Sequence, residues 1–330
     1  MKKNIKVHVL SRCDNRNISD DFAEIRLFAT VRNELARLPH FFDYYRRLGV
    51  SRFFFVDNAS TDGTERFLLE QEDCHVFHTT NSFSQGKVSW QNTLLDTFGA
   101  GHWCLIVDAD ELFVYPHCET VKLADFCRYL DQEKCEAVQS FLLDMYAEGN
   151  MANAVCVPAK SFTDICPYFD KDYSFLSRPC LPFSPKPYPP TEPIGGPRLR
   201  VFYSAWNKRT VWMQWKMRIY TKLGILCARA GLSRLRLYFQ SPPILYKVPL
   251  VKWKLGNASS EHTLVNHPPL SSVTSALLHF KFFDDFHKKA ATEVVRGQHF
   301  GGSIEYKRYL DNLNRNPETN FMYERSTRYE

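Results

Sequence analysis

The sequence predicts an α/β fold in which a mostly parallel β-sheet is flanked by helices. In the first half of the chain, short apolar segments rich in β-branched and aromatic residues alternate with segments of helical periodicity. Strands and helices that alternate in this way form parallel sheets joined by right-handed crossovers. The segment 103–107 is apolar throughout, as in a strand buried on both faces, and three carboxylates follow it between 108 and 111.

The individual elements follow from periodicity and from turn residues. Gly49, for example, comes directly after a run of apolar residues at helical spacing, where a left-handed helix cap is expected. In chain order we expect a strand at 24–31, a helix at 35–48, a strand at 51–56, a turn at 57–64, a helix at 64–70, a strand at 74–77, a helix at 86–98, the strand 103–107, a helix at 121–133 and a strand at 137–143.

The chain divides into three parts by composition. Residues 1–23 are a polar lead-in, residues 24–176 form the α/β core, and residues 177–330 form a helical and irregular extension. The extension opens with a segment, 177–197, that holds eight of the eighteen prolines. We expect order to return in a strand at 275–279 and a helix at 284–296.

Composition narrows the function classes. None of the ten cysteines forms a Cys-x-x-Cys pair, and no apolar region follows the first residues, which argues against a structural zinc site and a secreted disulfide framework. We therefore expect a cytoplasmic setting. No apolar run approaches the roughly 20 residues that a membrane-spanning helix needs, so we expect the chain not to cross a bilayer by itself.

Polar side chains follow four of the expected strands. These groups are Arg32-Asn33-Glu34, Asp57-Asn58, Asp108-Ala109-Asp110-Glu111 and Asp144. Ligands of open α/β sheets bind at the carboxyl ends of the strands, so the groups predict one site at that edge. Asp108 and Asp110 suit a hard divalent cation such as Mg²⁺ or Mn²⁺. For an isolated Asp-x-Asp, the alternative is an acidic turn after a core strand.

These motifs carry a resemblance to a known family. Arg32-Asn33-Glu34, the turn 57–64, Gln85-Gly86 with Asn92, and the segment 107–111 occur in the order and at about the spacing of family 2-like glycosyltransferases of the GT-A fold. The resemblance covers residues 24–145. The segments 195–200, 246–253 and 278–282 are similar to a bacterial, non-processive subgroup of these enzymes.

The resemblance implies a GT-A-like, Rossmann-related sheet with a C-terminal extension on the acceptor side. It also implies a metal-dependent enzyme that transfers one sugar, with inversion, from a nucleotide-sugar donor to a hydroxyl of a bacterial surface glycan or lipid-linked precursor. The Gln-x-x-Arg-Trp motif of processive synthases is absent from the sequence, which favours the addition of a single sugar. The implied cofactor is Mn²⁺ or Mg²⁺, which would stabilise the charge on the departing diphosphate.

Roles for single residues follow from the same comparison. Contacts to the donor are expected from Arg32, Asn33, Glu34, Asp57, Asn58, Lys87 and Asp108. Metal ligands are expected at Asp108 and Asp110, with a histidine at His279 or His262. Asp144 is the first choice for the base, because a strand-end carboxylate beside apolar residues can have a raised pKa, and Glu111 and Glu148 are its rivals.

Each assignment has a structural alternative. Asp57 is equally suited to an Asx-turn or a helix cap. A histidine in an apolar strand is often a hydrogen-bonded core residue, and an isolated lysine such as Lys87 is often only solvated. At the level of the whole protein, the alternatives are a nucleotidyltransferase and a catalytically silent module that binds nucleotide-sugars or a membrane surface.

The segment 198–254 contains thirteen lysines and arginines and no acidic residue. The aromatic residues in this segment include Trp206, Trp212, Trp215, Tyr220, Tyr238, Phe239 and Trp253. This composition indicates an element that lies on an anionic membrane surface, peripheral to the inner face of the membrane. Nucleic acid ranks well below lipid as a partner, because no nucleic-acid-binding motif accompanies these charges. The structural alternative is a solvated pair of basic helices.

Overall fold

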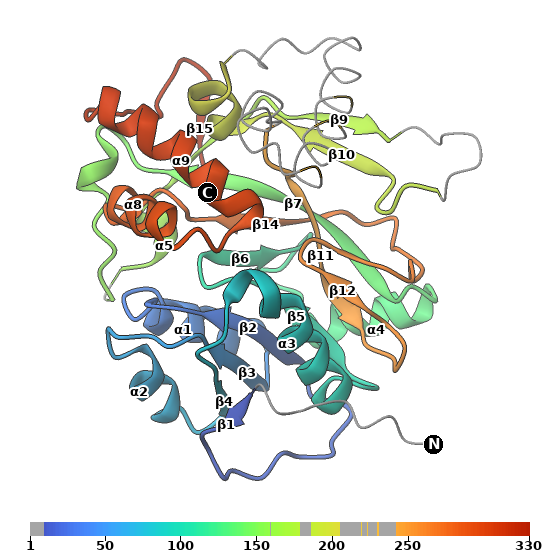
Figure 1. Ribbon diagram of the computed structural model, residues 1–330. Coiled ribbons are helices and arrows are strands. Elements are labelled where there is room, and N and C mark those ends of the chain that lie inside the picture. Colours follow the sequence, from blue (N-terminus) through green and yellow to red (C-terminus); the bar gives the residue numbers. More distant parts are fainter. Residues whose placement is uncertain are drawn as a thin grey trace.

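The computed structural model describes residues 10–158, 160–178, 186–204, 219, 223, 230 and 242–330. They form a mixed α/β structure around one large sheet with helices packed against it, as Figure 1 shows. The predicted class, an α/β sheet flanked by helices, is therefore confirmed. The strand order through this sheet is β1-β4-β3-β2-β5-β11-β7-β14-β6.

The first half of the chain builds the parallel part of the sheet. Its elements are β1 (Ser11–Arg12), β2 (Arg26–Val31), α1 (Leu38–Leu48), β3 (Arg52–Asp57), α2 (Thr64–Leu69), β4 (Cys74–His78), α3 (Phe83–Phe98) and β5 (Trp103–Ile106). The four neighbouring strands β4, β3, β2 and β5 are parallel to one another. Their carboxyl ends, which carry Val31, Asp57 and His78, therefore lie at one edge of the sheet.

The second half continues the same sheet with mixed strand directions. Its elements are β6 (Glu111–Val114), α4 (Leu123–Gln132), β7 (Ala137–Tyr146), a short helix (Met151–Asn153), α5 (Phe162–Ile165), β8 (Tyr168–Asp170), β9 (Ser174–Ser177), β10 (Thr191–Ile194), a π-helical turn (Arg198–Phe202), β11 (Tyr246–Lys252), β12 (Ser259–Ser260), β13 (Thr263–Leu264), β14 (Ser275–His279), α8 (Phe286–Arg296), α9 (Phe300–Arg315) and β15 (Ser326–Arg328). β11 is antiparallel to both of its neighbours, and β14 is parallel to β7 and antiparallel to β6.

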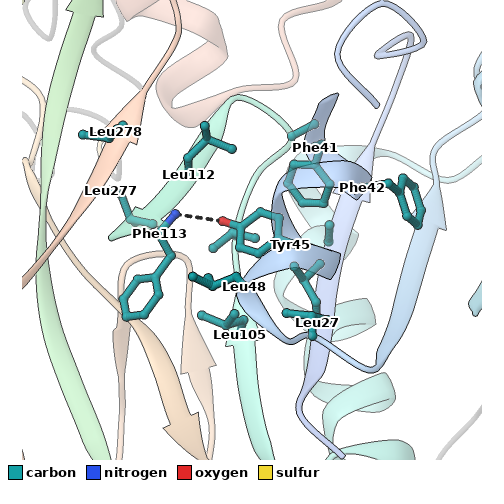
Figure 2. Close-up of a cluster of buried hydrophobic side chains, with 14 of the residues drawn as sticks. Leu27, Phe41, Phe42, Tyr45, Leu48, Leu105, Leu112, Phe113, Leu277 and Leu278 are labelled. Carbon is teal, nitrogen blue, oxygen red and sulfur yellow. Dashed lines mark hydrogen bonds between the residues drawn. The ribbon is translucent and has the colours of Figure 1, made fainter. Parts of the chain in front are cut away.

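The helix α1 connects the core to the turn that carries the acidic residues. Its buried face, which includes Phe41, Phe42 and Tyr45, packs against aromatic side chains of β3. The Tyr45 hydroxyl lies 3.1 Å from the backbone nitrogen of Phe113, from which it accepts a hydrogen bond (Figure 2), and it donates to the backbone oxygen of Glu111 at 2.9 Å. Because the hydroxyl satisfies two backbone groups of β6, α1 fixes the start of that strand.

The basic aromatic segment is only partly described, and the described part departs from the expectation. Trp206, Trp212, Trp215, Tyr220, Tyr238 and Phe239 lie outside the described residues. Trp253 is fully buried, and its indole nitrogen donates to Asp96 at 2.9 Å. Lys247 is also buried, in β11 at the centre of the sheet. The prediction that these two residues belong to a membrane-facing surface was wrong, because both have partners inside the protein. Among the described residues, no helix combines the length and apolar character that a membrane span requires.

Candidate functional site

The acidic turn between β5 and β6 is held by reciprocal hydrogen bonds. The backbone nitrogen of Asp108 donates to Oε2 of Glu111 at 2.9 Å, and the backbone nitrogen of Glu111 donates to the oxygen of Asp108 at 3.0 Å. The Glu111 side chain therefore closes the turn from within. Asp108 and Asp110 remain partly exposed, with 34% and 18% of their side chains accessible.

Two lysines contact Asp108. Nζ of Lys87, from α3, donates to Oδ1 at 3.0 Å, and Nζ of Lys247 lies 3.4 Å from Oδ2 and 2.5 Å from Oε2 of Glu111. Burial favours neutral Lys247, but the charges of Asp108 and Glu111 outweigh this effect and raise its pKa. Burial likewise opposes ionisation of Asp108, yet the two lysines lower the pKa of this carboxylate. Asp108 is therefore ionised, and two positively charged lysines contact it.

A second group of side chains is formed by Asp110, His279, Asp144 and Arg198. The sheet register pairs His279 with Glu111 on one side and with Asp144 on the other, which brings three strand ends together. Nδ1 of His279 lies 2.6 Å from Oδ1 of Asp144, and Nε2 lies 3.6 Å from Oδ2 of Asp110. Nε of Arg198 donates to the other oxygen of Asp144 at 2.7 Å.

The expectation of a raised pKa at Asp144 was wrong. Burial alone would raise this pKa, but Arg198 and His279 offset the effect, so the pKa of Asp144 is lowered. The side chain is also fully buried, with both oxygens paired. Glu111 is buried in its pair with Lys247, whereas Glu148 is exposed in the bend after β7. In this structure Asp144 contacts His279 and Arg198, and its side chain is not accessible to solvent.

Asp110 and His279 have the arrangement of two ligands for one cation. A carboxylate only accepts hydrogen bonds, so Nδ1 of His279 donates to Asp144 and Nε2 is directed toward Asp110. Histidine ligands of metals are typically held by a carboxylate in this way. Although burial favours the neutral ring, Asp110 and Asp144 raise the pKa of His279, so a bound cation would displace the Nε2 proton.

His262, the other candidate metal ligand, lies on the lysine side of the site. Burial and the positive charges of Lys247 and Lys87 lower its pKa to about 4, with Asp108 opposing. Its Nδ1 atom is buried and has no hydrogen-bond partner among the residues that the structure describes. His262 is therefore neutral, as a metal ligand must be. The charges that act on it most strongly, those of Lys247 and Lys87, are however positive, as a metal ion would be.

The residues expected to contact the donor divide into two groups. Lys87 and Asp108 belong to the site described above, and Arg32 lies at the same edge of the sheet, where it donates to the backbone oxygen of Asn58 at 2.8 Å. The other four make contacts that stabilise the local fold. Glu34 forms ion pairs with Arg37 and Lys289. The side chains of Asn33 and Asp57 accept hydrogen bonds from the backbone nitrogens of Thr61 and Ser60, respectively. The Asn58 side chain donates to the backbone oxygens of Thr79 and Asn81.

Some functional groups were outside the reach of the sequence reasoning. Lys247 was counted with a basic surface, although its buried partners identify it as part of the site. Arg198 was treated in the same way, although it is the partner of Asp144. Among the described residues, Asp57, Glu65 and His78 are grouped closely enough to hold a metal ion, apart from the predicted acidic turn. Comparisons with protein-family models and with curated proteins found no match.

Proposed function

We propose that this protein is a metal-dependent glycosyltransferase that moves a single sugar from a nucleotide-sugar donor to a hydroxyl of a bacterial surface glycan or lipid-linked acceptor. The observation that carries the proposal is the group Asp110–His279–Asp144, in which an acidic side chain and an oriented histidine converge at the end of a core strand. The resemblance of residues 24–145 to family 2-like enzymes supplies the reaction class.

The chemistry needs a site that stabilises negative charge on a departing nucleoside diphosphate. Mn²⁺ or Mg²⁺ held by Asp110 and His279 would supply this Lewis-acid chemistry. Lys87, with about 15% of its side chain exposed, is placed to exchange its contact with Asp108 for a phosphate oxygen. Lys247 stays buried with Glu111 and keeps the acidic turn in position.

A donor screen tests the proposal. The protein is mixed with a panel of nucleoside diphosphates and nucleotide-sugars, with and without Mn²⁺, and its thermal unfolding is followed. We expect one nucleotide class to raise Tm only when Mn²⁺ is present, and the matching nucleotide-sugar to release its sugar slowly to water or to an added acceptor. Asp110→Asn should abolish both effects. Asp43→Asn, which changes an exposed aspartate paired with Arg47, should leave them intact. A full response from Asp110→Asn would refute the proposal.

Asp144→Asn tests the positioning role of Asp144. If this carboxylate orients His279, the variant should weaken Mn²⁺ binding about 10- to 100-fold, as loss of a group behind a metal ligand usually does. If Asp144 were the base, the variant would lose turnover and retain Mn²⁺ affinity. Titration calorimetry with Mn²⁺ separates the two outcomes. Thermal melting checks that the variant is folded, since the change leaves the buried Arg198 with only Glu305, 3.9 Å away, as a charged partner.

One observation favours a second candidate, a module that binds nucleotide-sugars without turnover. Both carboxylates expected to act as the base, Asp144 and Glu111, are engaged in buried ion pairs. Such a module would give the Mn²⁺-dependent rise in Tm with a nucleotide-sugar but no release of the sugar with any acceptor. The donor screen therefore separates the two functions.

A further inference from the structure

A second candidate metal centre lies at the ends of β3 and β4, among Asp57, Glu65 and His78. Asp57 and His78 are the last residues of these parallel strands and face each other in register, and Glu65 lies in the first turn of α2. Nδ1 of His78 lies 3.0 Å from Oε2 of Glu65 and 3.5 Å from Oδ2 of Asp57. One ligand atom from each residue lies within 4.8 Å of the other two.

These distances match the spacing of ligands on one small cation. Oxygen and nitrogen ligands lie about 2.0–2.2 Å from Zn²⁺, so two of them in a tetrahedral site are roughly 3.3–3.6 Å apart. The measured separations are close to this range. A hydrogen bond from the His78 imidazole to Glu65 would account for the distance of 3.0 Å between them. It would not account for the 3.5 Å distance between the same nitrogen and Asp57.

Asp57 gives an independent indication of a missing partner. Its side chain is fully buried, and within the described part of the chain its Oδ1 atom has no hydrogen-bond partner. A buried carboxylate oxygen without a partner is costly, and a bound cation would neutralise the charge on the carboxylate. Ser60 and His78 both approach Oδ2, so neither satisfies Oδ1, which is free to bind a cation together with Oδ2.

We propose that Asp57, Glu65 and His78 bind a structural divalent transition metal, Zn²⁺ in preference to Mn²⁺, with water completing the coordination. The preference follows from the nitrogen ligand and from the general order of affinities, in which Zn²⁺ binds more tightly than Mn²⁺. The ion joins the ends of β3 and β4 to α2 and holds the turn 57–64, in which the backbone oxygen of Asn58 accepts a hydrogen bond from Arg32. In this arrangement Asp57 has the metal as its partner, in place of the nucleoside contact expected from the sequence.

The site is separate from Asp110 and His279, which allows a specific test. Metal-free protein is titrated with Zn²⁺ against a chromophoric chelator, and Tm is measured with and without the ion. The wild type should bind Zn²⁺ and gain stability, and one tight equivalent should remain in Asp110→Asn, in which the other group has lost a ligand. Glu65→Gln and His78→Asn should each weaken this equivalent by more than roughly 100-fold, because loss of a direct ligand costs more than loss of a group behind it. Glu65 is about one-third exposed, so Glu65→Gln does not disturb the core.

Three control variants define the source of any signal. Asp110→Asn should keep this equivalent, because its carboxylate belongs to the other group. His287→Asn should also keep it, since His287 is an exposed histidine paired with Asn314. Cys13→Ser removes a thiol that contacts Glu65 at the edge of the site, and it should keep this equivalent too, which excludes zinc capture by that thiol. If wild type and His78→Asn bind Zn²⁺ equally, or if only Cys13→Ser loses it, the proposal is overturned. Neither result bears on the donor screen with Mn²⁺.

Discussion

At the scale of single residues, the lowered pKa of His262 makes the stability of the protein depend on pH. Burial, Lys247 and Lys87 lower its pKa to about 4 in the folded protein, from the ordinary histidine value of 6.5. As the pH falls below 6.5, the unfolded chain takes up a proton that the folded protein refuses until about pH 4. The contribution of His262 to the free energy of unfolding is therefore fully present above pH 6.5 and is lost as the pH falls toward 4.

This effect can be measured as the free energy of unfolding in urea at pH 7 and pH 5, in the presence of a metal chelator. Wild type should lose on the order of 1–2 kcal/mol more than His262→Gln over this interval, with partial exposure of the ring reducing the full linkage value. His287→Gln, in which an exposed histidine is changed, should behave as wild type. A wild-type protein and a His262→Gln variant with the same pH dependence would show that His262 is not held neutral.

Residues of the candidate site could be picked out from the sequence where they lie next to a recognisable strand. Asp108 and Asp110 are adjacent to a recognisable core strand, and His279 follows a second one, so their positions could be inferred from pattern alone. The sign of the pKa shift at Asp144 could not be inferred, because it depends on Arg198, which is 54 positions away. Lys247 was missed for the same reason, since its partners Glu111 and Asp108 precede it by 136 and 139 positions.

At the scale of elements, Gly86 shows how closely α3 packs. A Cβ atom at this position would lie 2.1 Å from a ring atom of Trp90, whose side chain is buried one turn later. Alanine favours a helix by about 1 kcal/mol over glycine. We expect Gly86→Ala nevertheless to destabilise the protein by about 1–3 kcal/mol, because the buried indole must move. The double variant Gly86→Ala/Trp90→Phe, measured by urea unfolding, should cost less than the sum of its single changes. An additive result would mean that the two sites do not clash.

The expected elements of the first half agree closely with the structure. The strands at 51–56 and 74–77 and the helix at 64–70 differ from β3, β4 and α2 by a residue at most at their ends. Here the apolar periodicity is strong, and turn residues mark the boundaries. β11 was not recognised, because its lysines and its proline within the sequence Tyr-Lys-Val-Pro-Leu-Val-Lys hide an alternating strand pattern. Only its place between β5 and β7 makes Lys247 an inward-facing residue.

At the scale of the whole molecule, the sheet extends across the boundary expected at residue 176. The sequence indicated the parallel strands of the first half, since each is joined to the next by a helix. It did not indicate that β11 and β14, from the last third of the chain, lie between strands of the first half. Such insertions depend on contacts between distant segments, which periodicity does not record. The group Asp110–His279–Asp144 exists because of this arrangement.

A buried ion pair between distant segments allows a further prediction for the whole molecule. Arg37, which is 2% exposed and precedes α1, donates to both oxygens of Asp285, which precedes α8, at 2.8 and 2.7 Å. Asp285→Ala leaves a buried guanidinium with Glu34 alone, so we expect a loss of roughly 1–3 kcal/mol in urea unfolding, discounted because Asp285 is 39% exposed.

Replacement of the other partner, Arg37, should cost less stability than replacement of Asp285. Arg37→Met removes the buried cation, while Asp285 stays hydrated and Glu34 keeps its pair with Lys289 at 2.5 Å. Asp284→Ala, next to the ion pair, serves as a control for the loss of a neighbouring acid, because it gives up only a weak contact with the backbone nitrogen of Cys156. We therefore expect Arg37→Met to be more stable than Asp285→Ala, because water can reach Asp285 but not Arg37. The reverse order would show that the other contacts of Arg37, with Glu34 and the ring of Phe283, outweigh the cost of burying the cation without Asp285.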